Sequence, residues 1–113
     1  MTECLFCRIV DCDIPADVVL RTDSFVAFRD INPQAPVHVL VIPAAHHLDA
    51  AELAVADPEL AGRLLATAAQ VAESEGLASG YRIVLNTGAD AGQTVFHVHA
   101  HVLGGRDFLW PPG

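Results

Sequence analysis

Residues 96–105 have the sequence FHVHAHVLGG, in which three histidines alternate with two valines and an alanine. Side chains on a β-strand alternate between the two faces of a sheet. A strand over residues 96–103 would therefore place His97, His99 and His101 on one face. The valines and the alanine between them would face the opposite way, toward a helix packed on the sheet.

Three interpretations of these histidines compete. A solvated strand face would more often carry a mixture of polar residue types than three imidazoles. A metal site formed by all three is disfavoured, because the outer two are roughly 13 Å apart along a strand, while zinc–nitrogen bonds are only about 2.0–2.1 Å long. Acid–base or nucleophilic chemistry fits best, because imidazole can be a neutral nucleophile or a charged donor at cellular pH.

The rest of the chain predicts a mixed α and β structure. Its clearest element is a helix over 57–75, for which Asp57 is a good N-cap, Pro58 suits the first turn and Gly76 suits the stop. We also expect a short helix over 4–11. Apolar and β-branched residues predict strands over 18–20, 24–28, 37–43 and 81–86. This order indicates an α+β domain with a mostly antiparallel sheet and the long helix on one face.

The composition of the chain excludes several classes of function. The 113 residues suit one domain, 1–113, and carry a net charge of -8. This charge argues against nonspecific binding to nucleic acid or to an anionic membrane surface. All six basic residues are arginine, so lysine chemistry is excluded. Neither a long apolar segment nor a signal peptide is recognisable, so we expect a cytoplasmic protein.

Several motifs together resemble those of the histidine-triad superfamily. The segment HVHAHVL, residues 97–103, matches its signature. DINPQAPVHVLVIP (30–43), the longer segment 80–106 that ends in GGR, and the terminal WPPG are similar to the branch of histidine-triad nucleotide-binding proteins. The resemblance implies the HIT-like α+β fold, with about five strands, one long helix and a short N-terminal helix. It also implies a homodimer across which the sheet continues.

The resemblance further implies a purine nucleoside phosphoramidate hydrolase, which releases AMP or GMP from nucleotide conjugates. The position of the family nucleophile is His99, which would form a nucleotidyl-histidine intermediate that water cleaves. His101 matches the residue that hydrogen-bonds the phosphate oxygens, and His97 matches the first triad histidine, which supports the others. No cofactor is required for this catalysis.

Further residues match the family's nucleotide contacts. Because the chain is acidic, local hydrogen-bond donors must bind the phosphate, and Gly92, Gln93 and Thr94 are candidates. The family usually has serine in place of Thr94, so the hydroxyl is kept and a methyl group is added. The resemblance implies that the purine and ribose contacts come from Phe6, Ile9, Asp30, Ile31 and Asn86.

A structural zinc site is a separate expectation. Some superfamily members bind zinc through two cysteines, a histidine after the VIP segment and the first triad histidine. The matching residues here are Cys4, Cys7, His46 and His97. His47 is an alternative to His46, and two cysteines on a helix face would be the alternative to a metal site.

Other functions remain open. Sister branches that hydrolyse diadenosine polyphosphates or transfer nucleotidyl groups share the triad, although GGR and WPPG favour the phosphoramidase branch. A nucleotide-binding scaffold with little turnover is a further alternative, and a pure metal-binding module is disfavoured by the histidine spacing. The resemblance implies that the C-terminal segment with Trp110 contacts the partner subunit and affects substrate choice.

Overall fold

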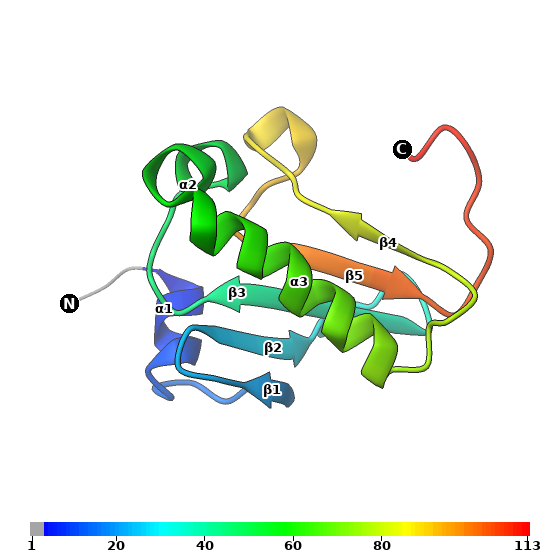
Figure 1. Cartoon of the computed structure of the whole chain (residues 1–113), viewed down its shortest axis with the longest axis horizontal. Coiled ribbons are helices and arrows are strands. Elements are labelled where there is room, and N and C mark those ends of the chain that lie inside the picture. The colour runs from blue at the N-terminus through cyan, green and yellow to red at the C-terminus, as the bar shows by residue number, and fades with distance from the viewer. Residues whose placement is uncertain (1–3) are drawn as a thin grey trace.

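The computed structural model describes residues 4–113 and has one sheet of five antiparallel strands in the order β1-β2-β3-β5-β4 (Figure 1). The strands are β1 (Val18–Arg21), β2 (Phe25–Arg29), β3 (Val37–Pro43), β4 (Tyr81–Val84) and β5 (Ala100–Gly104). The helices are α1 (Leu5–Val10), α2 (Ala50–Ala56) and α3 (Pro58–Ser74), with the 3-10 turn η1 (Ala89–Ala91) before β5. The predicted α+β class is confirmed. Within the described residues, no helix is both long and apolar enough to cross a membrane.

The two faces of the sheet are covered by different helices (Figure 1). On one face, α3 packs Leu64, Ala68 and Val71 against strand residues that include Val39 and Val41. The other face carries α1, in a cluster made up of Phe6, Ile9, Val26, Phe28, Leu40 and Ile42. Because β3 is central and covered on both faces, nearly all of its residues are buried, and its sequence is a continuous apolar run interrupted only by a histidine.

Asp57 joins two helices, one of which the sequence patterns did not predict. The Asp57 side chain accepts a hydrogen bond from the Leu60 backbone N–H at 3.1 Å, so it caps α3 as expected. The same residue ends the unpredicted α2, because a residue before proline is disfavoured in the helical region. Helix α2 begins after Asp49, whose side chain accepts from the Glu52 N–H at 2.9 Å.

The strand predicted over 96–103 is only partly correct, since β5 begins at Ala100. Its ladder with β3 runs from Val37 opposite Gly104 to Val41 opposite Ala100 and then stops. Before that point the chain turns to another partner, because the Val98 N–H donates to the His47 carbonyl at 2.8 Å. The bounds predicted for β3 are confirmed, and the other predicted elements differ from theirs by one or two residues, including β4, which ends before Leu85 and Asn86.

The alternation predicted for the histidine segment holds even where the ladder is absent. Val98, Ala100 and Val102 are buried in the cluster under α3, as expected. The three histidines face the side of α1, where Phe6 lies edge-on to the His97 ring at 6.2 Å and to the His99 ring at 5.1 Å between ring centroids. The fold therefore presents the triad to the space beside α1.

Candidate active site

A cavity of about 420 Å³ lies beside α1, β2 and the loop that precedes the triad. Of the residues expected at a nucleotide site, the following line it: Phe6, Ile9, Asp30, Ile31, Gly92, Thr94, His99 and His101. The structure does not bring Asn86 or Gln93 to this cavity. Asn86 follows β4, which is separated from β3 by β5, and Gln93 turns its side chain into the protein.

The hydrogen bond made by the His99 ring fixes its tautomer. His99 Nδ1 lies 2.8 Å from the His97 carbonyl oxygen, which can only accept, so Nδ1 carries the proton. Nε2 therefore keeps its lone pair. Burial lowers the pKa of His99 below its ordinary value, which keeps the ring neutral at neutral pH. The carbonyl that fixes this tautomer, which the sequence did not identify, thus belongs to the first histidine of the triad.

A relay of two hydrogen bonds, from Gln34 to His38 and from His38 to His101, sets the tautomer of His101. The Gln34 backbone N–H donates to His38 Nδ1 at 3.0 Å, so the His38 proton resides on Nε2. His38 Nε2 lies 2.9 Å from His101 Nδ1 and donates to it, which leaves the His101 proton on Nε2. Burial, together with the neighbouring His99 and His38 rings, lowers the pKa of His101 to about 4. Across residues 4–113, His101 Nε2 has no hydrogen-bond partner although it is buried, so it can donate to a ligand.

His38 is the functional candidate that sequence analysis missed. Its ring is buried beside Asp30, with 3.5 Å between His38 Nε2 and the Asp30 carboxylate, and burial lowers its pKa. The signal was present as a single histidine within the apolar strand VHVLVIP. Recognising it requires knowing that β3 pairs with β5, which brings the His38 side chain into contact with that of His101.

The two ring nitrogens of His97 contact different groups. His97 Nε2 donates to the Pro43 carbonyl at 2.8 Å, so the neutral ring has its lone pair on Nδ1. Nδ1 lies 3.4 Å from the sulfurs of both Cys4 and Cys7, and 3.1 Å from His46 Nδ1. Burial lowers the pKa of His97 to about 4, which keeps that lone pair available.

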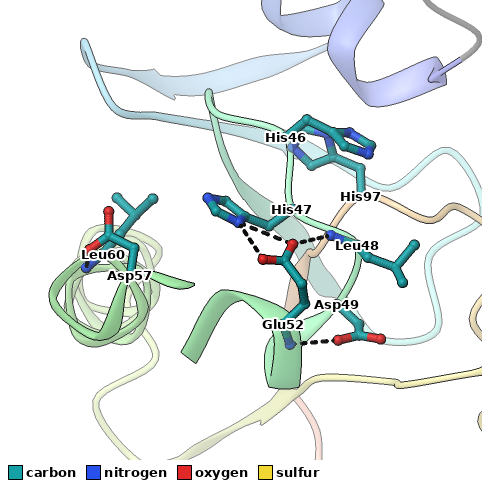
Figure 2. A network of polar contacts seen from close by, with 8 residues as sticks. All are labelled: His46, His47, Leu48, Asp49, Glu52, Asp57, Leu60 and His97. Atoms are coloured by element: carbon teal, nitrogen blue, oxygen red, sulfur yellow. Dashed lines mark hydrogen bonds and ion pairs between the residues drawn. The ribbon is translucent and has the colours of Figure 1, made fainter. Parts of the chain in front are cut away.

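Four ligand-type side chains meet at this point: Cys4, Cys7, His46 and His97. Bonds of about 2.0–2.3 Å in a tetrahedral zinc site place neighbouring ligand atoms roughly 3.3–3.8 Å apart. The measured separations between these ligand atoms, from 3.1 to 3.4 Å, are close to that spacing, so the donor set fits zinc. His47 points away from this cluster and contacts the Glu52 carboxylate at 3.1 Å, whereas His46 lies beside His97 (Figure 2).

Comparisons with known proteins point to one family. The sequence model described as "HIT domain" matches residues 12–108. An uncharacterized HIT-like protein of Synechococcus elongatus is 49% identical over 111 residues, which cover 98% of this chain and 97% of that protein. A protein of Arabidopsis thaliana named adenylylsulfatase HINT1 is 48% identical over 113 residues, covering 96% of this chain and 76% of its own length. The structure of a HIT family hydrolase from Legionella pneumophila matches with a TM-score of 0.94 and 46% identity, over 98% of this chain and 100% of that one.

Proposed function

Because this chain belongs to the HIT domain family, as the match over residues 12–108 shows, we propose that it is a hydrolase of nucleotide conjugates, specifically a purine nucleoside phosphoramidase. The observation that carries the proposal is the pair of fixed tautomers beside the cavity. His99 keeps a lone pair on Nε2, and His101 keeps an unpartnered Nε2–H. A nucleophile and a phosphate donor are the two groups that transfer at phosphorus requires.

The cavity suits a purine nucleoside monophosphate unit. Phe6 and Ile9 supply buried apolar surface for the base, and Ile31, which is fully exposed to solvent, lines the same cavity. Asp30 would accept from the ribose hydroxyls, with one oxygen already accepting from the Asn32 N–H at 2.8 Å. Gly92 and Thr94 line the same cavity as His99 and His101, which supports their proposed role as donors to the phosphate.

In the proposed reaction, His99 Nε2 attacks the α-phosphorus and the phosphorus–nitrogen bond to the amine breaks. The amine leaves as it takes up a proton from solvent water, and the nucleotide remains bonded to Nε2 of a His99 ring that keeps its Nδ1 proton and carries a positive charge. Water then attacks phosphorus, loses a proton, and breaks the phosphorus–histidine bond, which releases AMP or GMP. Throughout, the His101 Nε2–H stabilises the charge on the phosphate oxygens, as a preorganised donor in a partly enclosed site should.

The direct test is the substitution His99→Ala, assayed by release of AMP from an AMP–amine conjugate. Loss of a nucleophile should lower kcat by roughly a thousandfold or more. Binding of AMP, measured by calorimetry, should persist in the variant, because Phe6, Ile9 and Asp30 are unchanged. Turnover by His99→Ala at the rate of the unmodified protein would refute the role of His99.

A second candidate substrate is adenylyl sulfate, which is favoured by the 48% identity to the Arabidopsis thaliana protein named adenylylsulfatase HINT1. The same attack of His99 on phosphorus would then release sulfate in place of an amine. Turnover of an AMP–amine conjugate, adenylyl sulfate and a diadenosine polyphosphate should be compared on one preparation. Absence of turnover with all three, together with AMP binding, would favour the nucleotide-binding scaffold.

We also propose that the cluster of Cys4, Cys7, His46 and His97 holds zinc. Two thiolates and two imidazoles suit a closed, structural zinc site. Zinc would supply a cross-link between α1 and the triad segment and would take no part in the reaction. Zinc would fix the ring of His97, which already makes a hydrogen bond through Nε2. The backbone carbonyl of the same residue orients His99.

A homodimer is the third proposal. Among the described strands, β4 pairs only with β5, so its other edge is open to a second copy of the sheet. Trp110, in the C-terminal segment, is 83% exposed and could pack on a partner. Sedimentation should give twice the chain mass, and truncation after Arg106 should change the relative turnover of substrates with different leaving groups.

A further inference from the structure

Gln93 lies beside the proposed phosphate site without lining it. Its neighbours Gly92 and Thr94 line the cavity, whereas the Gln93 side chain is only 3% exposed. Its amide oxygen accepts from the Gly88 N–H at 2.8 Å, and its amide nitrogen donates to the carbonyls of Leu48 at 2.9 Å and Val95 at 3.2 Å. The side chain is therefore fully engaged with the backbone of three segments and has no donor left for a substrate.

Two of these contacts, to Gly88 and Val95, hold the loop over residues 87–95 at both of its ends. Gly88 lies at the start of the loop and has a φ of 87°, and Gly92 has a φ of 90°, so the loop depends on backbone conformations that favour glycine. Val95 lies at its end, two residues before the triad. A single buried amide thus joins the beginning of the loop to its end.

The third contact ties the loop to a rigid point outside it. The Leu48 N–H donates to the Glu52 carboxylate at 3.0 Å, and Glu52 is in turn the residue capped by Asp49 at the start of α2 (Figure 2). The carbonyl of His47, the preceding residue, accepts from the Val98 N–H. The short segment of His47 and Leu48 therefore contacts the loop through Gln93 and the triad through Val98, and it fixes one relative to the other.

We propose that Gln93 is a positioning residue, which sets the location of Gly92 and Thr94 relative to the ring of His99 by tying their loop to Leu48. This inference rests on the proposed function, because it assumes that Gly92 and Thr94 receive the phosphate. It replaces the sequence-based expectation that Gln93 itself contacts the substrate.

The first test compares Gln93→Met with Gln70→Met, the same change at an exposed position of α3. Methionine has a similar length but cannot make the three hydrogen bonds. We expect Gln93→Met to weaken AMP binding at least tenfold by calorimetry and to raise KM more than it lowers kcat. Amide hydrogen exchange at Gly88 should accelerate at least tenfold without nucleotide, and Gln70→Met should change none of these quantities.

The second test uses Gln93→Glu, which also serves if Gln93→Met does not fold. An ionised glutamate can still accept from Gly88, but it cannot donate to the Leu48 and Val95 carbonyls and is repelled by them. A protonated glutamate regains one donor. AMP binding by Gln93→Glu, relative to the unmodified protein at the same pH, should therefore recover as the pH falls from 8 to about 5.5. Gln93→Met has no titratable group at this position and should show no such recovery.

The outcomes separate this inference from the proposed function. If the unmodified protein binds AMP and both Gln93 variants bind it with unchanged affinity, Gln93 is not a positioning residue. The same conclusion follows if both variants are weakened equally at every pH. If the unmodified protein neither binds AMP nor releases it from a conjugate, the proposed function fails first, and the phosphate role of the loop fails with it.

Discussion

The relay from Gln34 through His38 to His101 can be broken at one bond. The substitution His38→Phe keeps a ring in the buried space but removes the Nε2–H that lies 2.9 Å from His101 Nδ1. A hydrogen bond between neutral groups contributes about 0.5–1.5 kcal/mol, and about 1.4 kcal/mol corresponds to a factor of ten. If that bond sets the tautomer of His101, kcat/KM for AMP release should fall by roughly 2- to 12-fold.

His38→Gln is the matched control, because the glutamine amide nitrogen can occupy the place of His38 Nε2 and still donate to His101. It should keep most of the activity. Both variants lose the acceptor for the Gln34 N–H, at a cost of about 1–3 kcal/mol in the free energy of unfolding, so both should be similarly destabilised in urea. Equal kcat/KM in His38→Phe, His38→Gln and the unmodified protein, with unchanged nitrogen NMR shifts of His101, would refute the relay.

Four further predictions concern pH, metal and helix capping. Because burial lowers the pKa of His99, kcat/KM should remain high as the pH falls through about 6.5 and should decline only below it; a decline centred above that pH would contradict a neutral, buried nucleophile. The pKa of His101 is lowered to about 4 in the folded state, so the unfolded chain binds more protons between that pH and the ordinary histidine pKa. The free energy of unfolding should therefore have its full value above the ordinary histidine pKa and fall as the pH is lowered toward 4. The loss due to His101 should be at most about 3 kcal/mol, measured by urea unfolding at several pH values. Cys7→Ser should reduce zinc from about one ion per chain to well below one by metal analysis, with a lower melting temperature; equal zinc contents, or little zinc in the unmodified protein, would remove the site. Asp57→Ala should lower the free energy of unfolding by about 1 kcal/mol through loss of the α3 cap, whereas Asp23→Ala, at an exposed turn, should leave it nearly unchanged.

Local patterns predicted most of the fold because they reflect local physics. The run VHVLVIP gave β3 its bounds, since a strand covered on both faces must be apolar along its whole length. Asp57, Pro58 and Gly76 predicted the ends of α3 through capping. The patterns failed at α2, a short helix that has only Leu53 fully buried, and at residues 96–99, whose backbone bonds to a distant segment.

The amino-acid sequence was enough to predict the composition of the site: three histidines in alternation, two cysteines in C-x-x-C spacing, and a loop with Gly92 and Thr94. Those facts depend only on residue type, spacing and resemblance. The folded arrangement was needed to assign the proton to one nitrogen of each ring, because the partners of those rings are Pro43, His38 and the His97 carbonyl. It likewise decided that His46, rather than His47, faces the cysteines, and that Gln93 bonds to the backbone instead of lining the cavity. Hydrogen bonds and metal-ligand sets act over a few ångströms, and residues far apart in the chain come within that range only when the fold brings them together.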